Sequence, residues 1–173
     1  ESAAAALRKA LDDGIRWGGH NSGLAAVAGL PLAEVLYETN DLEGARALIE
    51  EHMPAARKLS FADQLVSGHL TRSRLFSAQG DLAAARRALD EAMDVALECE
   101  LERLRLAVLQ EQVRLLLRNG MPDAAARQAR KAEITATNRD LSPHQKSTGC
   151  DELRAMIWAR MAISRESASA AVR

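Results

Sequence analysis

"LFSAQGDLAAARRALDEA", residues 75–92, has the pattern of two helices joined by a short turn. Gly80 tolerates the positive φ at which many helices end, and Asp81 is suited to capping the helix that follows. After the turn, apolar or small residues recur at spacings of four and three, which places them on one helix face. The stretch therefore predicts an antiparallel helical hairpin in which small residues allow close packing.

The same pattern recurs at a period of about 40 residues. A shift of 40 positions aligns residues 36–52 with residues 76–92 and with residues 116–132. The turn column of this alignment holds Asn40, Gly80 and Gly120, and the close-packing column holds Ala45, Ala85 and Ala125. One hairpin cannot cover both of its apolar faces, so the repeated units are expected to stack on one another.

The composition agrees with a stack of closely packed helices. Hydrophobic residues make up 47% of the chain but aromatic residues only 3%, so the apolar mass is mostly alanine and leucine. Four prolines and ten glycines leave long uninterrupted segments, which favours an all-α fold. Helices are expected near residues 2–17, 22–39, 42–59, 62–78, 82–98, 101–118, 122–137 and 149–166.

The boundaries between these helices rest on different signals. Residues 138–150 are rich in turn-forming residues and are expected to form a linker. The break between residues 98 and 101 contains no glycine or proline and follows from the repeat phase alone. Pro31 removes a backbone donor inside a helix and is expected to kink it. The single domain then divides into a half repeat, three repeats and a partial repeat, at residues 1–21, 22–61, 62–101, 102–141 and 142–173.

The turn and second helix of the hairpin, with Gly80, Ala85, Leu89 and Ala92, resemble the tetratricopeptide (TPR) motif. The first helix fits less well, and a period of 40 exceeds the usual TPR period of about 34 residues. The resemblance implies a right-handed superhelix of stacked antiparallel hairpins, which is a TPR-like α-solenoid. Because both ends of the chain lie in helix-forming sequence, we expect a fragment of a larger protein.

Hairpins of this longer kind are similar to those of the MalT-like, LuxR-type ATP-dependent transcriptional activators. The resemblance is strongest in "LPLAEVLYETNDLEGARALIEE" (30–51) and "SRLFSAQGDLAAARRALDEAMDVA" (73–96), and it extends weakly through residues 113–120. It implies a sensor domain that takes up a small-molecule inducer or a partner protein. ATP and DNA would then bind separate domains, so no cofactor is expected here. The alternative is a general TPR-like scaffold that binds a peptide or protein and has no link to transcription.

The charge balance and the absence of known site motifs exclude several classes of function. With 23 basic and 24 acidic residues, the chain lacks the basic excess of a nucleic-acid-binding domain. No phosphate-binding G-x-x-x-x-G-K-[ST] sequence and no G-x-S-x-G elbow is present. The histidines at 20, 52, 69 and 144 are too scattered for a zinc site. We therefore expect a protein that is neither an enzyme nor a metalloprotein.

The sequence also predicts a cytoplasmic protein. The sequence has no signal peptide and no run of 18 apolar residues, so no membrane contact is expected. Cys99 and Cys150 form no disulfide framework, and Cys99 lies in an apolar run where it is expected to be a small core residue. His69 is expected to be a partly buried packing residue. Self-association is expected because isolated repeats expose apolar end faces.

The TPR resemblance also suggests which positions of the first helices face a concave groove. The candidate ligand-binding residues are Glu34, Tyr37, Leu70, Arg74, Ser77, Gln110 and Arg114. Arg74 and Arg114 share one column with Glu34, and arginine forks suit carboxylate or phosphate recognition. The alternative is that these arginines are solvated or form salt bridges with Glu34 and Glu111.

Overall fold

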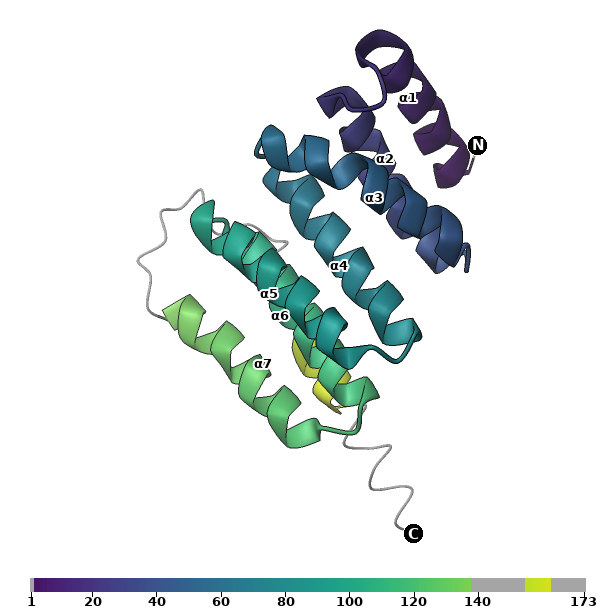
Figure 1. The fold of residues 1–173 in the computed structure, drawn as a ribbon. Helices are drawn as coiled ribbons and strands as arrows, with labels where there is room; N and C mark the ends of the chain where they lie inside the picture. Colours follow the sequence, from purple (N-terminus) through teal and green to yellow (C-terminus); the bar gives the residue numbers. More distant parts are fainter. Residues whose placement is uncertain (1, 138–154, 163–173) are drawn as a thin grey trace. The chain divides into compact units, whose positions relative to one another are not determined.

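The computed structural model describes residues 2–137 and 155–162, with side chains described for residues 2–131 and 155–162. The described residues form an all-helical protein, as the sequence predicts (Figure 1). The helices are α1 (Ala3–Gly18), α2 (Gly23–Glu38), α3 (Leu42–Lys58), α4 (Ala62–Ala78), α5 (Leu82–Glu98), α6 (Glu102–Arg118) and α7 (Pro122–Thr137). Their bounds lie within one residue of the predicted ranges. Residues 155–162, inside the last predicted helix, are also helical, whereas the predicted linker lies outside the described residues.

The chain forms two compact units, residues 1–99 and residues 100–173. In the first unit each helix packs against the next one in sequence, and α2 also packs against α4. Contact between the first helices of successive hairpins is how solenoid repeats stack, so α2–α3 and α4–α5 are stacked repeats. In the second unit α6 packs against α7, and Gln110 of α6 approaches Met156 of the helical segment 155–162. The handedness of the superhelix stays a prediction.

The structure confirms the predicted turn residues within the hairpins and shows a second set of turns between successive hairpins. Asn40, Gly80 and Gly120 have φ values of 65°, 80° and 67°, as their place at the helix ends requires. Ser60 and Glu100 also have positive φ, at 54° and 53°, so a left-handed residue recurs every 20 positions from 40 to 120. The predicted break after residue 98 is therefore correct. Sequence patterns missed the left-handed backbone there because serine and glutamate seldom adopt it.

The close-packing column is confirmed. Ala45, Ala85 and Ala125 are all fully buried, which lets the second helix of each hairpin lie close against the first. Gly29 has the same role between α2 and α3, since a Cβ atom there would overlap the ring of the buried His52. α2 continues through Pro31, so the proline does not end the helix, and the predicted kink stays a prediction.

Two expectations about single residues are corrected. Cys99 is exposed rather than part of the core, because it caps the C-terminal end of α5, beyond the last buried residue of that helix, Ala96. His69 is fully buried rather than partly buried, because it lies in the middle of α4 where α5 covers that helix.

Candidate functional site

Two predicted groove residues of the first unit, Glu34 and Arg74, meet where α2 packs against α4. The Nη1 atom of Arg74 lies 3.0 Å from Oε1 of Glu34 and 3.5 Å from Oε1 of Glu38. Ser67 Oγ donates to the other oxygen of Glu34, at 3.4 Å. The structure thus brings together the two charged residues that stand 40 positions apart. It also confirms the alternative interpretation, in which Arg74 pairs with Glu34.

The other predicted residues lie in partly exposed positions. Tyr37, Leu70 and Ser77 are each between buried and exposed, and Tyr37 packs against the core of the first unit. In the second unit the Nε atom of Arg114 donates to Oε1 of the buried Glu111, at 2.8 Å. Arg114 therefore pairs as the alternative interpretation proposed. Ligand binding by these seven residues stays a prediction.

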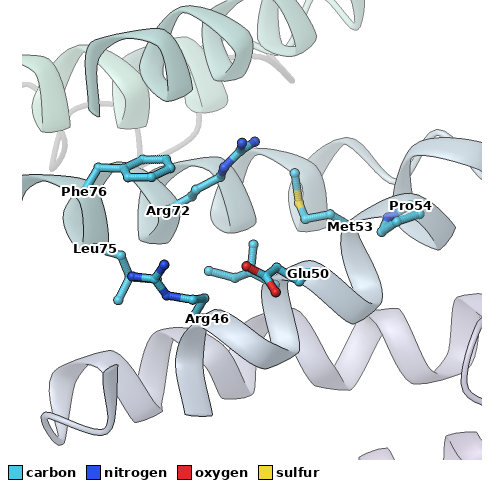
Figure 2. Close-up of a pocket in the computed structure, with 8 residues that line it drawn as sticks. Arg46, Glu50, Met53, Pro54, Arg72, Leu75 and Phe76 are labelled. Carbon is cyan, nitrogen blue, oxygen red and sulfur yellow. The ribbon is translucent and has the colours of Figure 1, made fainter. Parts of the chain in front are cut away.

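The structure shows a hollow on another side of α4, which the sequence did not indicate. We call it the α3–α4 hollow; it has a volume of about 410 Å³ and is lined by Arg46, Ile49, Glu50, Met53, Pro54, Arg72, Leu75 and Phe76 (Figure 2). Successive residues of an α-helix are turned by about 100°, so Arg72 and Arg74 point in nearly opposite directions from α4. The hollow therefore opens away from the α2 contact that holds Arg74.

The floor of the α3–α4 hollow is apolar. Ile49 and Leu75 are buried, with 4% and 5% of their surface exposed, while Met53 and Phe76 are half-buried. Met53 lies over Gly68 of α4, where a Cβ atom would overlap its sulfur. This glycine allows α3 and α4 to approach each other at one end of the hollow.

The charged residues around this floor differ in their pairing. The Nε atom of Arg46 is buried and has no hydrogen-bond partner among the described residues. Glu50 is exposed and follows Arg46 by four residues on α3, so both project from the same face (Figure 2). Arg72 lies with its guanidinium carbon 5.6 Å from the centre of the Phe76 ring, and its Nη1 atom is 3.4 Å from Oε2 of Glu91 on α5.

Two further hollows adjoin this region. One, of about 430 Å³, shares Met53, Pro54 and Arg72 with the α3–α4 hollow and adds Arg57 and Lys58. The other, of about 350 Å³, is lined in part by acidic residues of α5 and by the buried His69. The α3–α4 hollow and the hollow of about 430 Å³ are thus basic, with Glu50 as the single acidic residue that lines them. The third is mainly acidic.

Two histidines of the first unit are buried and neutral at pH 7. Burial lowers the pKa of His69 to about 4, against the opposing effect of Glu91, whose Oε2 lies 3.1 Å from His69 Nδ1. Arg57 and Arg72 lower this pKa further. Burial also lowers the pKa of His52, against the opposing charge of Glu51. The folded protein therefore favours the uncharged form of both histidines, and their protonation lowers the free energy of unfolding.

The described residues contain no group of three or more His, Cys, Asp or Glu side chains that could hold a metal ion. Within the same residues, no helix has the length and apolar character needed to cross a membrane.

Sequence reasoning did not identify the lining of the α3–α4 hollow as a site. One signal was available in the alignment: Arg46 and Arg86 occupy the same column, directly after the buried alanines of two successive repeats. An arginine beside a close-packing alanine indicates a charged group held at the edge of the helix contact.

Three known proteins match this chain, all of them serine/threonine-protein kinase PknK: from Mycobacterium tuberculosis strains CDC 1551 / Oshkosh and ATCC 25618 / H37Rv, and from Mycobacterium bovis strain ATCC BAA-935 / AF2122/97. Each is 36% identical over 109 residues, which is 63% of this chain and 10% of the relative. The chain is thus similar to a short segment of much longer proteins. No protein-family profile matches it, and no solved structure does.

Proposed function

We propose that this chain is the effector-sensing and protein-interaction domain of a LuxR-type bacterial transcriptional regulator. It would bind a small-molecule inducer or a partner protein and transmit that event to separate ATPase and DNA-binding domains. The observation that carries the proposal is the α3–α4 hollow, in which stacked repeats present an apolar floor beside charged side chains. Ligand sites in proteins commonly combine these two features. The resemblance of residues 30–51 and 73–96 to MalT-like regulators supports the link to transcription.

The similarity to PknK supports a role as one part of a longer protein, since the matched segment is a tenth of that kinase. We do not extend kinase activity to this chain, because its sequence has no G-x-G-x-x-G loop and no D-F-G motif. We propose instead a cytoplasmic, non-enzymatic domain that holds no cofactor and does not itself contact nucleic acid. Trp17 and Leu24, with 81% and 62% of their surface exposed, are candidates for a self-association surface.

The first test is the complete coding sequence around this chain. The proposal expects a phosphate-binding loop in an upstream domain and a helix-turn-helix in a downstream domain. A coding sequence with neither would contradict the transcriptional role and favour the general scaffold.

The second test is a reporter gene controlled by the full-length protein. Substitutions in the lining of the α3–α4 hollow, such as Arg46→Gln, should alter the response to inducing conditions without lowering the amount of protein. The predicted groove has its own test in the same assay, the Arg74→Ala/Arg114→Ala double variant. A reporter that responds normally in all these variants would contradict sensing by this chain.

A further inference from the structure

We propose that the α3–α4 hollow binds a small amphipathic monocarboxylate, with its apolar body on the floor and its carboxylate at Arg46. This inference rests on the proposed sensing function and names the chemical class of the effector.

The shape of the hollow favours a small molecule with an apolar body. Its volume of about 410 Å³ lies within the range of about 300–1,000 Å³ typical of ligand sites. Ile49, Met53, Leu75 and Phe76 supply apolar surface from two helices. Methionine adapts its shape to irregular ligands, and the Phe76 ring offers a flat face for a chain or a ring.

The charges of the hollow favour an anion. Its charged lining residues are Arg46 and Arg72 against Glu50, and the adjoining hollow adds Arg57 and Lys58. Arg72 already forms an ion pair with Glu91. We therefore take Arg46 as the primary anion-binding group of the hollow. The Nε atom of Arg46 is itself buried, but it has no hydrogen-bond partner among the described residues, so no hydrogen bond through this atom holds the guanidinium away from the hollow that the residue lines.

The type of anion follows from the same residues. A guanidinium presents neighbouring N–H groups that match the two oxygens of a carboxylate. Glu50, one turn from Arg46, repels a second negative charge and so disfavours dianions such as phosphate monoesters. Arg74, by contrast, already contacts Glu34 and Glu38, so an anion there would have to displace two carboxylates.

The experiment is a calorimetric titration of the purified chain with octanoate, compared with 1-octanol and octyltrimethylammonium. Octanoate should bind about 10-fold more tightly than octanol, because a charge-assisted hydrogen bond contributes in that range. The ammonium probe should bind more weakly than either. Equal affinity for octanoate and octanol, or no binding of octanoate, would overturn the proposal.

Variants locate the carboxylate. Arg46→Gln should weaken octanoate binding about 10-fold while leaving octanol binding unchanged. Arg87→Gln, which removes an exposed arginine from α5, is the matched control and should change neither affinity. Glu50→Gln should tighten octanoate binding about 3-fold, a gain that misfolding cannot produce. Unchanged octanoate affinity in both Arg46→Gln and Glu50→Gln would contradict this site.

The outcomes separate the two proposals. If octanoate fails to bind while the full-length reporter still responds through this chain, the sensing function stands and the ligand class is wrong. If octanoate binds as predicted but the coding sequence holds no ATPase or DNA-binding domain, the site stands and the transcriptional role is wrong.

Discussion

The two sides of α4 border arginines in different electrostatic settings. On the side facing α2, Arg74 lies against two carboxylates and only 15% of its side chain is exposed. On the side that borders the α3–α4 hollow, Arg46 of α3 keeps a buried donor without a hydrogen-bond partner among the described residues. The first arginine completes a contact between repeats, whereas the second has binding capacity left. Having an arginine in register is therefore not enough to identify a binding site.

The largest effect is expected when the contact between α4 and α5 is disrupted. Ala85 of α5 is fully buried, so Ala85→Arg forces a long charged side chain into a close helix contact. Overpacking and the burial of a charge together should cost about 3 kcal/mol or more, which lowers Tm by at least about 6 °C. Circular dichroism during heating measures it, with Ala83→Arg at an exposed position of α5 as control. A parent-like melt of Ala85→Arg would contradict the repeat packing.

The next effect concerns pH and the buried His69 beside the hollows. Its pKa is about 4 in the folded protein and about 6.5 in the unfolded chain. The unfolded chain therefore binds the proton more readily, so the stability is complete above pH 6.5 and falls as the pH drops from 6.5 towards 4. The difference between the two pKa values corresponds to a loss of about 3 kcal/mol in the free energy of unfolding over this pH range.

The free energy of unfolding in urea, measured at pH 7 and at pH 4.5, tests this prediction. His69→Gln removes the titrating group, so the variant should lose less stability on acidification than the parent. Burial lowers the pKa of His52 as well, so part of the acid sensitivity should remain in the variant. Equal pH dependence in parent and variant would show that His69 is not held neutral by burial.

A smaller effect is expected on the α2-facing side. A double-mutant cycle with Arg74→Ala and Glu34→Ala should give a coupling energy of about 0.5 kcal/mol, because Glu34 is 43% exposed and solvent screens the pair. The coupling should fall further in 1 M NaCl. A coupling energy near zero at low salt would mean that Arg74 is not committed to Glu34, and the contrast with Arg46 would be lost.

The sequence predicted the helices and the contacts between repeats, because both follow from periodic patterns. Small residues every 40 positions predicted the close packing, and the same register paired Glu34 with Arg74. Cys99 was assigned to the core because its apolar neighbours suggested a continuing buried face, but α5 ends one residue earlier.

The α3–α4 hollow could not be predicted in this way. Arg46 and Arg72 stand 26 positions apart and share no column of the repeat. Whether two helices leave a hollow depends on the volumes of the side chains between them, such as Met53 over Gly68. The sequence pattern identifies which faces meet, but not how completely the side chains fill the space between them.

The most direct test of the central claim is an NMR titration of the chain labelled with ¹³C at its methionine methyl groups. Met53 lies on the floor of the hollow, and the Met53→Leu variant assigns its signal. Octanoate should shift the Met53 signal with saturation and leave that of Met93 on α5 unchanged, and Arg46→Gln should raise the octanoate concentration at half of the shift about 10-fold. A Met53 signal that does not move, or one that moves equally in Arg46→Gln, would contradict an anion site between α3 and α4.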